Sequence, residues 1–427
     1  MACSLNVIAV LSFSILGVAS GQKELEIDKD ENIEAFALLC RIYNVAKNPP
    51  INHVDLEEPH KIVEEINSIN ASFSEEKVAN ETEQMGNIVV AQHSTTTREA
   101  ALGQLSLNQI TQRAHKILED IRKINVTKEI EKAKAEFHQV IFGDDGNESN
   151  LCHATVKGMD NRSDVCGKPG QLSKGNGAGK NLVVDFFCLC AQRTDSSEGA
   201  KQACGFHVGR IDKHYGWSEQ GPWGSSTMWA SIKGGCGKHM QQHPKSTAEA
   251  RHILDQFLKH LKTGGVYRWG SGAKIEGSER KAGMLGTGVG AKEGAVSGPV
   301  CDGKKGNGRT SPSTGGVCVY YGQESDSWEE KILWLKKFKT ALGTADALNR
   351  QTATVQRDIK RLHMLLHRAE EIYETAKVIP EVKNSVGLPE AFSNATGNLT
   401  AHNATRTRSY SHSVNHYLIT LCAVLLI

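Results

Sequence analysis

Residues 333–377 read LWLKKFKTALGTADALNRQTATVQRDIKRLHMLLHRAEEIYETAK and carry the strongest structural signal in the chain. One set of its residues recurs every seven positions, and a second set follows the first by four positions. The first set is Trp334, Ala341, Leu348, Val355, Leu362, Ala369 and Ala376. The second set is Phe338, Ala345, Thr352, Ile359, Leu366 and Tyr373. Such heptads indicate a coiled-coil seam, which over about 43 residues predicts roughly 64 Å of helix.

A glycine inside this stretch leaves a second interpretation open. Gly343 weakens the middle of the helix, since glycine costs about 1 kcal/mol relative to alanine there. An ordinary amphipathic helix bent around a globular core would show a similar apolar stripe. The unbroken heptads favour the coiled coil, and the alanines in the seam indicate that a partner helix approaches closely. We therefore expect a mainly α-helical fold built on an elongated rod.

The partner helices are expected over about 31–143. Residues 33–45 are apolar at helical spacing, and the pair Pro49–Pro50 must end that helix. A second helix is expected over about 56–89. A third has its apolar residues three and four positions apart, namely Leu107, Ile110, Ala114, Ile117, Ile121 and Ile124. The register slips near Asn125, and the stripe continues with Ile130, Ala133, Phe137 and Val140. This third helix and the helix of about 327–377 are expected to pair antiparallel.

The segment of about 144–325 has a different character, and we call it the head. It contains most of the glycines and most of the cysteines. One helix is expected over about 247–263, because Ser246 and Glu249 are spaced as a capping box and Gly264–Gly265 would end it. The remainder is expected to form loops and short strands that disulfides hold together, inserted at one end of the rod.

Cysteine usage indicates an oxidising compartment. Of the 11 cysteines, Cys3 and Cys422 lie in the two terminal segments. The disulfide candidates are the remaining nine, Cys40, Cys152, Cys166, Cys188, Cys190, Cys204, Cys236, Cys301 and Cys318. Because nine is odd, one of them stays free or bridges to another chain. The sequence does not say which cysteines pair.

The two ends of the chain resemble targeting signals. Residues 1–21 begin with an apolar run and end in small residues, which is typical of a secretory signal peptide. The apolar tail 417–427 is too short to cross a bilayer, and a polar spacer and small residues precede it. This pattern predicts a glycosylphosphatidylinositol (GPI) attachment signal over 404–427 that is removed, with Asn403 as the attachment residue and Ser409 or Ser411 as alternatives. A polar, glycosylated stalk of 381–403 would precede it.

Glycosylation triplets support the same secretory route. Candidate N-glycosylation sites are Asn70, Asn80, Asn125, Asn147, Asn161, Asn394 and Asn398. Asn403 also begins a triplet, and it cannot carry both a glycan and the anchor. Each triplet alone is a weak signal, because several occur by chance.

Composition excludes some functions. The formal net charge is only +2, which argues against a chain that binds nucleic acid over its whole surface. The chain is 39% hydrophobic and 23% charged, so it has enough apolar residues to fold. No set of acid, base and nucleophile residues stands out, and we expect no enzyme activity and no cofactor.

Three motifs that resemble binding sites are better explained otherwise. Residues 174–181 (KGNGAGKN) lack the first glycine and the hydroxyl residue of a phosphate-binding loop. Cys236, His239 and His243 have a spacing that suits zinc, but a secreted cysteine is expected to form a disulfide. Three tryptophans recur every six residues and indicate either a local aromatic core or a ligand-contact surface, and they are Trp217, Trp223 and Trp229.

One further stretch carries a resemblance. Residues 33–51 read IEAFALLCRIYNVAKNPPI, and residues 38–50 are the most specific part. With the heptads, the cysteine-rich insert and the terminal signals, the chain closely resembles the variant surface glycoproteins of African trypanosomes, most of all the congolense type related to the B-type N-terminal domain. Many members have a second, cysteine-rich C-terminal domain, but no cysteine lies between Cys318 and Cys422. We therefore expect one ectodomain over 22–380.

The resemblance implies what the protein does. It implies a GPI-anchored protein in the outer leaflet of the plasma membrane, a homodimer through the helical rod. It also implies a dense protective coat that is exchanged for antigenic variation and evades host antibodies, with no nucleic acid as partner. The alternative function is a GPI-anchored receptor of the same helical fold that binds a host serum macromolecule.

Overall fold

The computed structural model describes residues 24–83, 93–195, 197–209, 216–239, 244–271, 274–291, 298–306 and 314–385. The chain divides into two units, Met1–Tyr373 and Glu374–Ile427. All contacts discussed below lie within the first unit. The predicted signal peptide and the predicted GPI signal lie outside the described residues, as does most of the predicted stalk.

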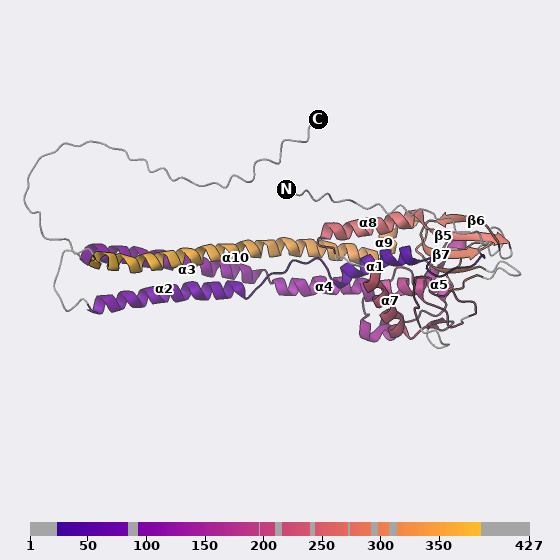
Figure 1. The fold of residues 1–427 in the computed structure, drawn as a ribbon, viewed down its shortest axis with the longest axis horizontal. Coiled ribbons are helices and arrows are strands. Elements are labelled where there is room, and N and C mark those ends of the chain that lie inside the picture. The colour runs from indigo at the N-terminus through magenta and orange to yellow at the C-terminus, as the bar shows by residue number, and fades with distance from the viewer. Residues whose placement is uncertain are drawn as a thin grey trace, which may run out of the picture. The chain divides into compact units, whose positions relative to one another are not determined.

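The first unit is mainly helical, as predicted, with short strands confined to the head (Figure 1). Its helices are α1 (Ile33–Lys47), α2 (Glu58–Glu83), α3 (His93–Lys123), α4 (Val126–Phe142), α5 (Arg162–Cys166), α6 (Leu182–Cys190), α7 (Ser225–His239), α8 (Thr247–Thr263), α9 (Trp328–Lys331) and α10 (Leu333–Ser385, which continues into the second unit). Its strands are β1 (Gly167–Lys168), β2 (Ser173–Lys174), β3 (Gly216–Ser218), β4 (Gly221–Trp223), β5 (Gly265–Ser271), β6 (Lys274–Lys281), β7 (Met284–Gly290) and β8 (Gly315–Tyr320).

Helices α2, α3 and the part of α10 up to Tyr373 pack together, and we call them the helical arm (Figure 1). Asn70 of α2 donates to Asn108 of α3 at 3.1 Å, and His115 of α3 lies 3.0 Å from Asn67 of α2, so these two helices run antiparallel. Helix α10 runs parallel to α2. Glu58 and Phe73 of α2 meet His363 and Tyr373 of α10, the first pair at 2.8 Å and the second with ring centroids 6.3 Å apart.

The heptad pattern of α10 is used in two different packings. Every seam position from Trp334 to Leu362 is buried, whereas Leu366, Tyr373 and Ala376 are half-buried. The first four, Trp334, Phe338, Ala341 and Ala345, belong to the main hydrophobic core of the head. Those from Leu348 to Tyr373 lie in the helical arm. Helix α10 therefore begins as a core helix of the head, as the second interpretation describes, and continues as an arm helix.

The register slip predicted near Asn125 is a break between α3 and α4. Asn125 has φ 46° and ψ 48°, a left-handed conformation that Asn tolerates better than most residues. Beyond it α4 packs on α10, with the rings of Phe137 and Phe338 5.9 Å apart. The predicted seam is largely buried, but Ile117, Ile124 and Ile130 are only half-buried, and Leu118 is buried in place of Ile117.

Two glycines in the long helices lie in opposite environments. A Cβ added to Gly103 of α3 would lie 3.1 Å from the Phe73 ring and 3.7 Å from Ile372, so all three helices of the arm meet there. A Cβ added to Gly343 of α10 would meet nothing within 4 Å. Gly103 therefore limits how closely the arm helices approach, whereas Gly343 lies where an added methyl group would contact no neighbour.

This contrast predicts opposite effects on stability. We expect Gly103→Leu to lower the free energy of unfolding by about 1–2 kcal/mol through overpacking. We expect Gly343→Ala to raise it by about 0.5–1 kcal/mol, because alanine favours the helix. Denaturant unfolding followed by circular dichroism measures both. Equal changes in the two variants would contradict the packing described here.

The head contains more regular structure than its sequence predicted. A four-stranded sheet has the order β6-β5-β7-β8, in which only β5 and β7 are parallel. Strands β7 and β8 are buried along their whole length. The short strands expected here are confirmed, but the sequence did not indicate that four of them pair into one sheet, because glycines interrupt them.

The helix expected over about 247–263 is confirmed. Helix α8 covers Thr247–Thr263, with the Ser246 side chain accepting from the Glu249 N–H at its start and Gly264 at its end. The capping pattern predicted both ends. Helix α6 is the centre of the head, since all nine of its residues are buried.

Candidate functional site

The described residues contain no group of three or more His, Cys, Asp and Glu side chains placed to hold a metal ion. Cys236 of the zinc-like triplet is bonded to Cys40. His243 and the side chain of His239 lie outside the described residues. The cysteine of the triplet therefore belongs to a disulfide.

The KGNGAGKN segment is a tight turn that starts α6. Its Gly179 N–H donates to Asp185 Oδ1 at 2.9 Å, and the Asn181 side chain caps the helix by accepting from the Val184 N–H at 3.0 Å. A Cβ at Gly175 would lie 2.2 Å from the Val165 carbonyl. The glycines are explained by this close packing against protein backbone.

The three tryptophans divide between core and surface. Trp217 and Trp229 are 2% and 1% exposed, and Trp229 packs edge-on against Tyr43 at 5.4 Å. Trp223 is 55% exposed at the end of β4. The predicted aromatic core therefore holds for two of the three rings.

Four disulfides hold the head together. They are Cys40–Cys236, Cys166–Cys188, Cys190–Cys204 and Cys301–Cys318. The first joins α1 to α7 across 196 residues, and the other three close loops of 22, 14 and 17 residues. Cys152 is free and exposed. The bonds attach α6 on two sides, through Cys188 and Cys190, to the loops around it.

Two buried polar side chains cap the C-terminal end of α6. Arg162, only 3% exposed, donates to the Ala191 carbonyl at 2.7 Å and the Cys188 carbonyl at 2.8 Å, and lies 5.3 Å from the Trp217 ring. Burial lowers the pKa of Arg162 to about 9. Asn32 donates to the Leu189 carbonyl at 2.9 Å. A cation at this end complements the helix dipole, and the free carbonyls gain partners.

A buried carboxyl group joins α6 to α10. Asp185 is fully buried and accepts hydrogen bonds from the Gly179 N–H at 2.9 Å, the Tyr321 hydroxyl at 2.8 Å and the Trp334 indole at 2.6 Å. Trp334 is the first seam position of the heptads. Asp185 therefore fixes the start of the long helix to the centre of the head.

Stability is expected to depend on pH through this group. Burial raises the pKa of Asp185 to about 7, although its hydrogen bonds act in the opposite direction. The folded state therefore keeps a proton that the unfolded chain loses near its ordinary pKa of 3.8. The stabilisation that this proton gives the folded state is fully present below pH 3.8 and is lost as the pH rises through about 7. Asp185→Asn should flatten the fall in unfolding free energy between about pH 5 and about pH 8, as denaturant titrations would measure. An unchanged slope would assign the dependence to another group.

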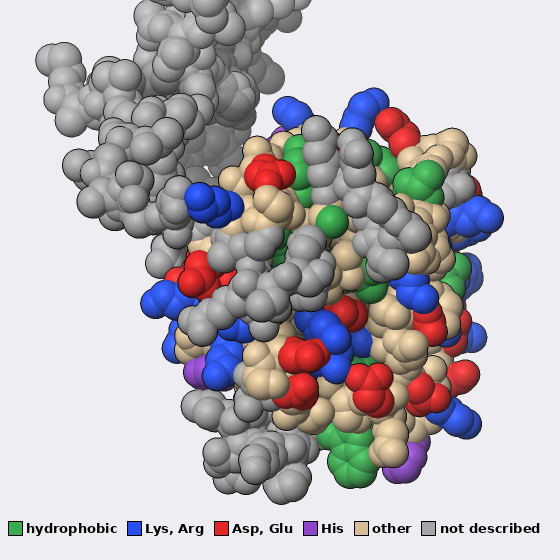
Figure 2. Space-filling model, turned by 90° about the vertical axis from the view of Figure 1, so that its right-hand side faces the viewer, with side chains coloured by type: hydrophobic (Ala, Val, Ile, Leu, Met, Phe, Trp, Pro, Cys, Tyr) green, Lys and Arg blue, Asp and Glu red, His purple; other side chains and the backbone are tan. Residues whose placement is uncertain are grey.

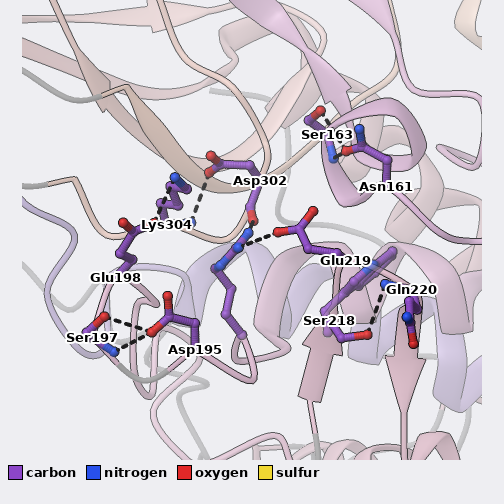
Figure 3. A network of polar contacts seen from close by, with 12 residues as sticks. Asn161, Ser163, Asp195, Ser197, Glu198, Ser218, Glu219, Gln220, Asp302 and Lys304 are labelled. Atoms are coloured by element: carbon purple, nitrogen blue, oxygen red, sulfur yellow. Dashed lines mark hydrogen bonds and ion pairs between the residues drawn. The ribbon is translucent and has the colours of Figure 1, made fainter.

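Three loops of the head meet in a network of polar side chains (Figure 3). Arg193 donates to Glu219 at 2.7 Å and to the Asp302 carbonyl at 2.9 Å. Lys304 pairs with Glu198 at 2.7 Å. Burial raises the pKa of Asp302, whereas hydrogen bonds from Ser197 lower that of Asp195. The network therefore joins the three loops.

The end of the head has a mixed surface. Figure 2 shows acidic and basic side chains interspersed on this face, with smaller hydrophobic areas between them. The described large apolar side chains that are most exposed are distributed over the head and the arm, and they are Leu102, Leu105, Leu172, Trp223, Leu333 and Met364. An interspersed surface of this kind suits a soluble, close-packed molecule.

The glycosylation triplets lie in three settings. Asn125, Asn147 and Asn161 are exposed at or between helix ends. Asn70 is half-buried, where α2 contacts α3. Asn80 lies on α2, but its side chain is outside the described residues, as are Asn394, Asn398 and the anchor candidates Asn403, Ser409 and Ser411. Among the described helices, none is long and apolar enough for a membrane span.

Comparison with known proteins gives a consistent result. A family model of the trypanosomal VSG domain matches residues 15–101 and 89–364. Variant surface glycoprotein YnAT 1.3 of Trypanosoma congolense is 26% identical over 264 residues, which cover 61% of this chain and 58% of that protein. Variant surface glycoprotein YnAT 1.1 of the same organism is 29% identical over 253 residues, covering 54% of this chain and 57% of that protein.

The matched part of the chain thus spans less than two thirds of either relative's length. The family model, however, covers the arm, the head and most of α10. The resemblance seen in the sequence is confirmed. The chain belongs to the trypanosomal VSG domain family.

Proposed function

We propose that this chain is a GPI-anchored variant surface glycoprotein, which forms part of a dense protective coat on a trypanosome. Membership of the VSG domain family carries the proposal. The relatives named above are variant surface glycoproteins of Trypanosoma congolense. The coat shields the membrane from host antibodies by filling space, and exchanging one coat protein for another changes the antigens on display.

The helical arm supports a space-filling role. The part of α10 in the first unit, residues 333–373, spans roughly 60 Å at 1.5 Å per residue. Helix α2 packs on it through polar and aromatic side chains, and α3 meets it at Gly103. Three parallel or antiparallel helices have a small cross-section for their length. Molecules with their arms along the membrane normal would therefore pack at high density.

The head supports variation without loss of fold. Its stability rests on buried groups such as α6, Asp185 and the four disulfides. Surface loops tolerate substitution when buried groups of this kind hold the scaffold. Antigenic loops could therefore change while α6 and the arm stay the same.

Anchoring and assembly complete the proposal. Attachment of the lipid at Asn403, or at Ser409 or Ser411, would hold the ectodomain to the outer leaflet with lateral mobility. A homodimer through the arm would cover exposed apolar side chains there, among them Leu102 at 56%, Leu105 at 55% and Met364 at 64% exposure.

The number of molecules on the cell tests the function. A phosphatidylinositol-specific phospholipase should release the protein from living cells as one very abundant species. Clones that have switched coats should release a different species. A few copies per cell, present in every clone, would support the serum-macromolecule receptor instead. Failure of the phospholipase to release the protein would contradict the anchor.

A further inference from the structure

We propose that Asn125, Asn147 and Asn161 carry N-linked glycans and that Asn70 stays unmodified and instead holds two arm helices together. This inference rests on the proposed function, because it requires that the chain enters the secretory pathway. The four triplets look alike in sequence. They differ in what each amide group does in the folded protein.

The Asn70 amide is used at both of its polar atoms. Its Nδ2 donates to Asn108 Oδ1 at 3.1 Å, and its Oδ1 accepts from Gln104 Nε2 at 2.8 Å. Ser74 extends the network by donating to Gln104 Oε1 at 3.0 Å. A glycan replaces one of the two Nδ2 hydrogens, so the sugar would start beside Asn108 and Gln104 on a half-buried side chain. It would compete with these contacts between α2 and α3.

The amides of Asn147 and Asn161 are used only at the carbonyl oxygen. Asn147 Oδ1 accepts from the Ser149 hydroxyl at 2.7 Å. Asn161 Oδ1 accepts from the Ser163 N–H at 3.1 Å and from its hydroxyl at 3.0 Å, and Figure 3 shows this pair facing each other. Within the described residues, no hydrogen bond uses either Nδ2. Glycosylation keeps the carbonyl oxygen, so both contacts survive it.

The Asn125 side chain is exposed and has no helix-capping hydrogen bond that a glycan would disrupt. It lies at the break between α3 and α4. Thr127, the third residue of its triplet, is exposed as well. A sugar at this position would project from the break without displacing a packed neighbour. Glycans are bulky and soluble, so three of them would fill space beside the arm and the head.

Four matched substitutions test the assignment. Ser72→Ala, Thr127→Ala, Ser149→Ala and Ser163→Ala each remove one triplet and leave its asparagine in place. The full chain is expressed in cultured trypanosomes and released with phospholipase, and its mass is measured before and after peptide N-glycosidase. We expect the last three variants each to lose the mass of one glycan, and Ser72→Ala to match the parent. Loss of a glycan in Ser72→Ala, or an unchanged mass in any of the others, overturns the assignment.

A second measurement tests the structural role of Asn70. Asn70→Ala should lower the melting temperature of the released protein by a few degrees, because it removes the two hydrogen bonds that Asn70 makes to Asn108 and Gln104 of α3. Ser72→Ala is the matched control and should not change it. Equal melting temperatures in both variants would overturn the role given to Asn70.

The outcomes also separate this inference from the proposed function. If phospholipase releases the protein and the Asn70 peptide carries a sugar, only the glycan assignment fails. If the chain stays inside the cell with every triplet unmodified, both fail.

Discussion

Replacing Asp185 with alanine should lower the free energy of unfolding by about 3 kcal/mol or more at about pH 6, because three buried donors lose the carboxyl group that accepts their hydrogen bonds. The change leaves the Gly179 N–H, the Tyr321 hydroxyl and the Trp334 indole without their acceptor. All three lie in the interior, where water cannot replace the carboxyl group. Denaturant unfolding of the phospholipase-released protein measures the loss.

Asp185→Asn is the matched control for this prediction. Its carbonyl oxygen can still accept from Trp334 and Tyr321, whereas its amide group opposes the Gly179 N–H. We therefore expect a loss clearly smaller than that of Asp185→Ala. If alanine were as stable as asparagine, Asp185 would not be what fixes α10 to the head.

Removing the Cys40–Cys236 disulfide should have an effect of similar or greater size. The double variant Cys40→Ala with Cys236→Ala opens a loop of 196 residues. In the chain-entropy treatment such a loop contributes about 5 kcal/mol by restricting the unfolded state. Both cysteines are also buried, at 0% and 1% exposure, so packing is lost as well. The free energy of unfolding under non-reducing conditions measures the effect.

A shorter disulfide provides the comparison. Cys190→Ala with Cys204→Ala opens a loop of only 14 residues, which corresponds to about 3 kcal/mol. The order of the two losses is therefore fixed by loop length. A larger loss at Cys190–Cys204 would mean that native packing around α6, and not the unfolded chain, determines these energies.

The long helices could be predicted from the sequence because their signals are local and repeated. The heptads from Trp334 onward predicted α10, and the capping residues Ser246 and Glu249 predicted α8 at both ends. The change of partner along α10 could not be predicted. Trp334 and Leu362 occupy the same heptad position, yet one is fixed by Asp185 and the other lies in the arm.

The sheet of the head escaped prediction for a physical reason. Strand β7 reads MLGTGVG and is buried on both faces, so it has neither alternation nor enough branched side chains to mark a strand. Its glycines allow close approach instead, since a Cβ at Gly288 would lie 2.5 Å from Pro299. Packing between distant segments of this kind leaves no periodic signal.

The sequence indicated which asparagines and cysteines were candidates for glycans and disulfides, but not which partners each has in the folded protein. Four triplets on described side chains look equivalent in sequence, and only the folded protein sets Asn70 apart, by its burial and its hydrogen bonds to α3. Likewise, nine candidate cysteines did not indicate that Cys40 would reach Cys236. Partners far apart along the chain are decided by the fold.

The bond between Cys40 and Cys236 has a consequence for damage at the cell surface. It ties α1 to α7, so every loop between these two residues lies within one covalent ring. A single cut by a host protease anywhere in that ring releases no fragment. The nicked molecule would keep its full length on a non-reducing gel and separate only after reduction. In the proposed coat, clipped molecules would thus stay whole and remain in place.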